Sequence, residues 1–157
     1  MVDQNVYSES KIQQIAITEV RNRYPATYGL LFHVPNGGLR DPRTASILTG
    51  QGVVPGIQDL FFLWAGKFYL IEVKDAKGQV SPAQKVIHAQ HKLHGIDTYV
   101  FRTSEQIIDF VGHIVLGQDI GAFTFFISPY SNAERLQQYK EEYREYRMKG
   151  KGKKLVC

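Results

Sequence analysis

Two short apolar runs on either side of a glycine-containing turn constrain the fold of this chain most strongly. The runs cover residues 60–64 and 68–73, and Ala65, Gly66 and Lys67 separate them. Aromatic and β-branched residues that flank such a turn are typical of a β-hairpin. The sequence therefore predicts an antiparallel hairpin whose turn centres on Ala65 and Gly66.

Charged residues occupy the open end of this predicted hairpin. A hairpin that is symmetric about its turn pairs Leu63 with Phe68. The same register places Asp59 opposite Glu72, and because strand side chains alternate between faces, Lys74 shares their face. Two opposed carboxylates repel each other, and a divalent cation between them relieves the repulsion. The alternative is a turn acid beside an ordinary surface ion pair, and a register shifted by one residue would separate the two acids.

An amphipathic helix is expected before the first strand. Ser8 or Ser10 opens it, and apolar residues recur at helical spacing up to about residue 24. A helical projection puts Glu19 inside the apolar stripe. Glu19 either supplies a third carboxylate to the acidic pair or forms an ion pair with Arg23 at the edge of the stripe.

A second helix is expected to begin at Ser81. Ser81 fits the N-cap, Pro82 the first turn, Gln84 the far half of a capping box and Gly95 the C-terminal stop. The N-terminus of this helix presents free N–H groups suited to a phosphate or a polarised water. A zinc site is not favoured, because no cysteine accompanies the three histidines that step around the helix, His88, His91 and His94.

The remaining chain alternates between strand and helix patterns. Strands are expected at residues 30–34, 98–102 and 122–127, and residues 40–49 fit a short helix or an ordered loop. Further helices open at Thr103 or Ser104 and at a capping box of Ser131 and Glu134. The last helix carries a tyrosine stripe that either docks on the domain or pairs with a second copy. This order predicts an α/β sandwich around a mixed sheet.

Composition and charge narrow the class of protein. A chain of 157 residues with 43% hydrophobic residues fits one globular domain. No apolar run approaches the ~20 residues of a membrane span and no signal peptide is indicated, so a membrane protein is not expected. The single cysteine, Cys157, fits a cytoplasmic location. Residues 140–154 hold seven lysines or arginines and three glutamates. This excess of positive charge favours a nucleic acid as the partner, and an anionic membrane surface is the second choice. The alternative is a solvated helix end that serves solubility alone.

Three motifs in order resemble a known group of nucleases. Asp59 is followed thirteen residues later by Glu-Val-Lys and then by a helix that starts Ser-Pro-Ala-Gln. This order resembles the PD-(D/E)xK nuclease superfamily, and VPGIQDLFF with LIEVKDAKGQVSPAQ resembles its VRR-NUC branch, whose small stand-alone members are typical of phages and bacteria. The resemblance covers roughly residues 19–110. It implies a restriction-endonuclease-like three-layer sandwich with a central mixed β-sheet flanked by helices, a nuclease domain at residues 1–130, and a C-terminal basic helix and tail at 131–157, in the same domain or appended to it.

The resemblance also implies roles for residues at the hairpin end. Asp59, Glu72 and the backbone carbonyl of Val73 would hold Mg²⁺ or Mn²⁺. Lys74 would position or help activate the attacking water, and Gln84 would orient that water or a phosphate. Glu19 would match the acid that the first helix of such enzymes often supplies.

Residues in the connections around the hairpin are candidates for nucleic acid contacts. They are His33, Asn36, Arg40, Lys77, Ser81 and Lys85. Gln58, directly before the acidic motif, stands where relatives often have proline, which is a departure from the family pattern that leaves Asp59 itself unchanged.

The expected activity is hydrolysis of phosphodiester bonds in DNA. A carboxylate-held Mg²⁺ or Mn²⁺ both activates a water and relieves the charge on the phosphate. Because stand-alone VRR-NUC proteins resemble junction-resolving enzymes, the resemblance implies a Holliday junction-resolving homodimer that acts on branched DNA. Its expected location is the cytoplasm, which is that of the bacterial host if the gene is phage-encoded. The alternatives are a nuclease of flap, nick or duplex specificity, and a non-catalytic nucleic-acid-binding module on the same fold.

Overall fold

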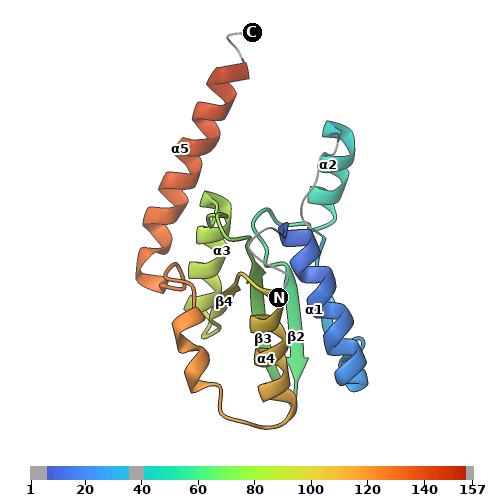
Figure 1. Ribbon diagram of the computed structural model, residues 1–157. Coiled ribbons are helices and arrows are strands. Elements are labelled where there is room, and N and C mark those ends of the chain that lie inside the picture. Colours follow the sequence, from blue (N-terminus) through green and yellow to red (C-terminus); the bar gives the residue numbers. More distant parts are fainter. Residues whose placement is uncertain (1–6, 36–40, 155–157) are drawn as a thin grey trace.

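The computed structural model describes residues 7–35 and 41–154, with side chains up to residue 150. The elements follow one another as shown in Figure 1. They are α1 (Glu9–Arg23), η2 (Pro25–Thr27), β1 (Leu31–His33), α2 (Pro42–Gly50), β2 (Leu60–Trp64), β3 (Lys67–Val73), α3 (Pro82–Leu93), β4 (Thr98–Phe101), α4 (Ser104–Val115), η3 (Gly121–Phe126), η4 (Ala133–Arg135) and α5 (Leu136–Lys154).

The four strands form one mixed sheet in the order β1-β2-β3-β4. The first three strands are antiparallel, and β4 lies parallel to β3 after the crossover through α3. Leu63 pairs with Phe68, which confirms the predicted register of the hairpin. Ala65 and Gly66 both have positive φ angles, 48° and 76°, as a two-residue type I′ turn requires.

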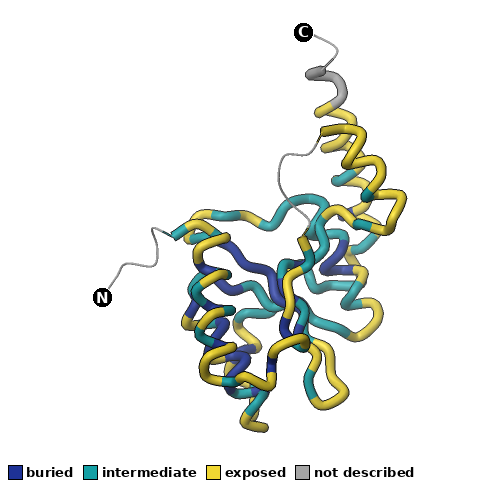
Figure 2. The backbone as a smooth tube through the Cα atoms, turned by 90° about the vertical axis from the view of Figure 1, so that its right-hand side faces the viewer, coloured by how far each residue is buried: buried dark blue, intermediate teal, exposed yellow. Residues whose placement is uncertain are grey.

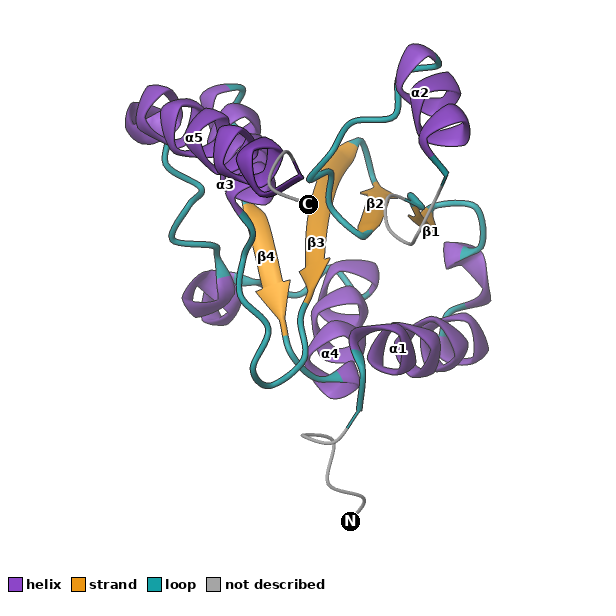
Figure 3. Cartoon of the chain, turned by 90° about the horizontal axis from the view of Figure 1, so that it is seen from above, coloured by secondary structure: helices purple, strands orange, loops and turns teal. Residues whose placement is uncertain are grey.

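Helices cover both faces of this sheet. Viewed from above, α1 and α4 lie on one face, while α3 and α5 lie on the other (Figure 3). The main core fills the space between the sheet and the first pair of helices, and Figure 2 shows the buried chain gathered in this body. The prediction of an α/β protein with a mixed sheet between helical layers is therefore confirmed. Central members of the core are Ile12, Val20, Leu60, Phe62, Ile71, Phe101 and Phe110.

Capping side chains set where the helices nearest the open end of the hairpin begin. Ser8 caps α1 by accepting a hydrogen bond from the Lys11 N–H. Ser81 and Gln84 form both halves of the predicted capping box at the start of α3. The first turns of both helices therefore start at fixed points beside the end of β3.

The strand expected at residues 122–127 is not present, and that prediction was wrong. Residues 121–126 form η3, and only Ile127 makes an isolated bridge, to Tyr99. Phe123 and Phe126 pack their rings against Phe101, with centroid distances of 6.4 and 5.2 Å. A short apolar run carries no periodicity that separates a strand from a helical turn, so this aromatic packing decides the conformation.

The start of the last helix also differs from the prediction. Asn132, rather than Ser131, caps η4 by accepting a hydrogen bond from the Glu134 N–H. The Ser131 hydroxyl instead accepts a hydrogen bond from the Thr98 N–H of β4 at 3.0 Å. The predicted capping box is therefore absent, because its serine ties this segment to the sheet.

Only the first half of α5 docks on the body. Tyr139 is buried and packs edge-to-face on Tyr130, with ring centroids 5.7 Å apart. Tyr146 is 62% exposed, and the distal half of the helix projects away from the sheet (Figure 1). The N-terminal part of the tyrosine stripe therefore packs on the domain, which is one of the two alternatives expected for it. None of the helices formed by the described residues is long and apolar enough to cross a membrane.

Candidate metal centre

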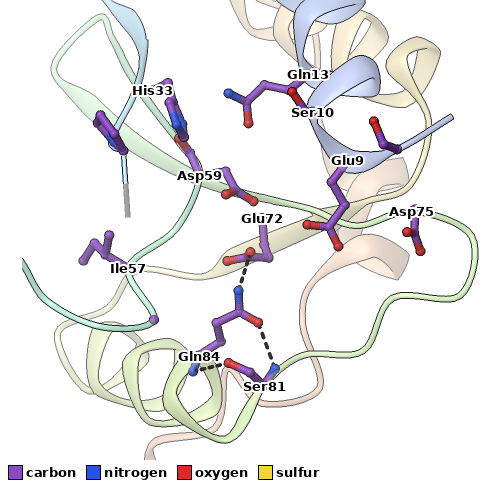
Figure 4. A pocket seen from close by; sticks show the side chains of 13 residues that line it. Glu9, Ser10, Gln13, His33, Ile57, Asp59, Glu72, Asp75, Ser81 and Gln84 are labelled. Atoms are coloured by element: carbon purple, nitrogen blue, oxygen red, sulfur yellow. Dashed lines mark hydrogen bonds between the residues drawn. The ribbon is translucent and has the colours of Figure 1, made fainter. Parts of the chain in front are cut away.

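A cavity of about 820 Å³ opens at the end of the hairpin that carries the acids. It lies between the first turn of α1, the chain entering β2, the end of β3 and the first turn of α3 (Figure 4). Four of the residues that line it are acids, Glu9, Asp59, Glu72 and Asp75. Carboxylates from separate parts of the chain therefore share one solvent-accessible space.

Asp59 and Glu72 come together as the predicted register requires. The Asp59 Oδ2 atom accepts a hydrogen bond from the Val73 N–H at 2.8 Å, which fixes this carboxylate at the end of β3. Glu72 is only 1% exposed, although it lines the cavity. Burial, followed by the negative charge of Asp59, raises the pKa of the Glu72 carboxyl to about 10. A cation at the cavity would stabilise the ionised form of this carboxylate.

Lys74 is a buried member of the same cluster. Its Nζ atom lies 3.9 Å from Glu72 Oε1 and 3.9 Å from Glu9 Oε1, and the residue is 6% exposed. The alternative of an ordinary surface ion pair between Glu72 and Lys74 is therefore wrong. A lysine held in this position adds positive charge behind two of the carboxylates that line the cavity.

Gln84 joins the N-terminus of α3 to Glu72. Its Oε1 atom accepts a hydrogen bond from the Ser81 N–H at 2.8 Å, which fixes the orientation of the amide. The Nε2 atom then donates to Glu72 Oε1 at 2.7 Å (Figure 4). The same amide orientation therefore caps the helix and contacts Glu72. Its predicted contact with water or phosphate stays a prediction.

The first helix supplies Glu9, and not Glu19, to the cavity. Glu19 is paired with Arg23 at 3.3 Å and does not line the cavity, so the structure corrects its placement as the third acid. Burial raises the pKa of Glu9, and Lys74 partly offsets this effect. Sequence reasoning missed Glu9 because an acid directly after an N-cap also suits the helix dipole. Only the packing of α1 brings it to β3.

The segment before Asp59 is tightly held. Gly56 has a φ of +83°, and a Cβ atom there would lie 2.5 Å from the Ala83 carbonyl carbon. Gln58 is fully buried, and its Nε2 atom donates to Thr98 Oγ1 at 2.8 Å. The glutamine that departs from the family pattern therefore anchors this segment to β4, while Gly56 lets it approach α3.

Two of the predicted nucleic acid contacts line the cavity. They are His33, whose Nδ1 atom hydrogen-bonds the Asp59 carbonyl at 2.7 Å, and Ser81. Both lie within reach of a ligand in the cavity. Asn36 and Arg40 were predicted from the same connection but lie outside the described residues.

The two predicted lysine contacts lie outside the cavity lining. Lys77 is exposed in the loop after β3, where its N–H donates to Asp75 Oδ1 at 3.0 Å. The Lys85 ammonium lies 4.6 Å from the centroid of the Tyr130 ring. Lys85 therefore takes part in packing near the base of α5, whereas Lys77 remains accessible.

The donor set at the cavity fits a hard divalent cation. Among residues 7–35 and 41–154, no three His, Cys, Asp or Glu side chains converge closely enough to hold a metal ion by themselves. Mg²⁺ characteristically takes one or two carboxylates and completes its shell with water and substrate phosphate. Asp59 and Glu72 match that requirement, and a backbone carbonyl contribution from Val73 stays a prediction.

Comparison of the chain with models of protein families, with curated proteins and with solved structures finds no match.

Proposed function

We propose that this protein is a metal-dependent DNA endonuclease of the PD-(D/E)xK superfamily, VRR-NUC branch, with a restriction-endonuclease-like fold. The observation that carries the proposal is the buried Glu72 carboxylate beside Asp59 and Lys74 at the rim of a cavity. A buried acid next to a second acid is costly unless a cation compensates both. A module that only bound nucleic acid would gain nothing from acids that face phosphate.

Each residue of the site would have its own role in phosphodiester hydrolysis. Asp59 and Glu72 would hold Mg²⁺ or Mn²⁺, which when bound supplies a Lewis acid for the phosphate and activates water. Gln84 holds the Glu72 carboxylate in place through its hydrogen bond of 2.7 Å. The Lys74 ammonium, 3.9 Å from a carboxylate oxygen of both Glu72 and Glu9, would position or help activate the attacking water.

The direct test of this proposal is cleavage of end-labelled DNA in Mg²⁺, in Mn²⁺ and in EDTA. We expect cleavage with either metal and none in EDTA. Binding of DNA without cleavage in both metals would contradict the proposal and favour the non-catalytic module.

The distal half of α5 supports contact with DNA beyond the cavity. At 100° per residue, three of its cationic residues fall on one side of the helix, whereas its glutamates and Lys149 fall on the opposite side. This half projects from the same end of the molecule as the first turn of α1, which lines the cavity (Figure 1). A cationic stripe there is placed to follow the phosphates of a duplex bound at the cavity. Its described members are Lys140, Arg144 and Arg147.

Neutralising this stripe is expected to weaken DNA binding in a salt-dependent way. Glutamine at the three positions should raise Kd about tenfold or more at 0.1 M salt, and should lower the slope of log K against log[salt] by roughly two to three units. Fluorescence anisotropy on a catalytically inactive background measures both quantities. The matched control replaces three glutamates on the opposite side of the helix, Glu141, Glu142 and Glu145. Equal affinity of the stripe variant and the wild type for DNA would contradict the contact and favour a role of the basic helix in solubility.

A homodimer is part of the proposal, and two apolar surfaces support it. The nine-residue helix α2 buries none of its residues, and Ile47 is 52% exposed. An isolated helix of this length is marginal in water, so α2 requires a packing partner. One face of the sheet also exposes Phe32, Leu63 and Phe68. A second copy offers each surface an apolar complement. A mass of one 17.9 kDa chain by light scattering at micromolar concentration would contradict the dimer.

A further inference from the structure

A buried histidine contacts Glu72 from inside the protein. His88 lies one helical turn after Gln84 on α3, is 0% exposed and does not line the cavity. Its Nε2 atom is 3.6 Å from Glu72 Oε2. Both atoms are fully buried, and neither has a hydrogen-bond partner among the described residues. A histidine that served only to fill the core would not leave two facing polar atoms unpaired.

A hydrogen-bond contact on the far side of the ring is compatible with a proton on Nε2. The Ser128 Oγ atom lies 2.8 Å from His88 Nδ1, and the same oxygen accepts a hydrogen bond from the Tyr130 N–H at 3.1 Å. A serine hydroxyl can donate one hydrogen bond and accept two, and donation from Ser128 to His88 Nδ1 would use its one proton. In that arrangement Nδ1 is the acceptor, and the ring proton of the neutral imidazole is on Nε2.

Resting on the proposed function, we infer that His88 is a positioning residue for the metal-binding carboxylate. Its Nε2–H donates to Glu72 Oε2 when Glu72 is ionised, while the Gln84 amide donates to Oε1. The two donors are four residues apart on one face of α3, so the same helix donates a hydrogen bond to each oxygen of the Glu72 carboxylate. The remaining lone pairs of Glu72 are thereby held toward the cavity. Outer partners of this kind set the orientation of metal-binding carboxylates.

The first readout observes the tautomer in the wild-type protein at saturating Mg²⁺, which keeps the Glu72 carboxylate ionised. Long-range ¹H–¹⁵N NMR correlations separate an imidazole protonated on Nε2 from one protonated on Nδ1. We expect the neutral Nε2–H form for His88. The Nδ1–H form would overturn the inference, because Nε2 would then face Glu72 without a proton.

The second readout is Mn²⁺ affinity, measured by titration of the free-ion electron paramagnetic resonance signal. His88→Leu removes the donor and is expected to weaken Mn²⁺ binding about tenfold or more. His88→Gln returns an amide donor toward Glu72 and should recover most of the affinity. His94→Leu makes the same change at the exposed C-cap of this helix and should leave the affinity unchanged.

The outcomes separate this inference from the proposed function. Wild-type affinity in folded His88→Leu, or a glutamine variant no better than the leucine variant, would overturn the role of His88 alone. A wild-type protein that binds no Mn²⁺ would overturn the metal site itself. Should His88→Leu fail to fold, Ser128→Ala takes its place: it frees the ring to exchange tautomers and is expected to weaken Mn²⁺ binding several-fold, and unchanged affinity there would contradict the inference.

Discussion

Replacing Glu72 by glutamine is expected to reduce metal-dependent cleavage of DNA by about 10³-fold or more. The substitution keeps the shape of the side chain and removes the charge that holds the cation, and a bound cation contributes several kcal/mol of transition-state stabilisation. Glu72 is buried beside Asp59 and Lys74, so no bulk solvent ion replaces its charge. Single-turnover cleavage of a labelled DNA measures the loss, and circular dichroism checks the fold.

Glu19→Gln is the matched control for this substitution. It makes the same chemical change on a carboxylate that is paired with Arg23 outside the cavity. We expect it to cleave within a few-fold of the wild type. Cleavage by Glu72→Gln at more than a tenth of the wild-type rate would contradict the assignment of the site.

The metal-free protein is expected to lose stability as pH rises from 7 to 9. The folded protein keeps a proton on Glu72, whose pKa is raised by burial and then by Asp59, whereas the unfolded chain has already released it. Raising the pH favours the state with fewer bound protons, so the free energy of unfolding falls by up to about 1.4 kcal/mol per pH unit. Lys74 opposes the shift, Glu9 adds to it, and His88 is neutral in both states above pH 7.

Chemical denaturation at several pH values measures this slope. Glu72→Gln has no proton to lose at this position, so its free energy of unfolding should be flatter across the same window and higher than that of the wild type at pH 9. Saturating Mg²⁺ should flatten the wild-type slope as well, because it stabilises the ionised carboxylate. Parallel slopes in the wild type and in Glu72→Gln would show that Glu72 is ionised in the metal-free protein.

Local signals in the sequence were sufficient for the acidic pair. The turn at Ala65 and Gly66 fixes the register, and the register alone places Asp59 near Glu72. The capping box likewise follows from residues three apart in the chain, Ser81 and Gln84. Both features depend on contacts between near neighbours, which periodicity and turn chemistry encode directly.

Features that depend on packing between distant segments were not readable in this way. Glu19 fits the apolar stripe of α1 on a helical wheel, yet the position of the whole helix brings Glu9 to the cavity. For His88 the sequence indicated only that a zinc site is not favoured, because its partners Glu72 and Ser128 lie on other elements. The aromatic run at residues 122–127 is a 3-10 segment because its rings pack on β4 and α4. In each case a tertiary contact decides between conformations or roles that the local sequence allows.

The most direct test of the proposed function is cleavage of a labelled four-way junction, with linear duplex of the same sequence as control. The reaction is run in Mg²⁺, in Mn²⁺ and in EDTA, and with Glu72→Gln in each metal. A metal-dependent dimeric resolvase predicts paired cuts confined to the junction, none in EDTA and none with the variant. Binding of the junction without cleavage in either metal, or cleavage that Glu72→Gln retains, would contradict the account.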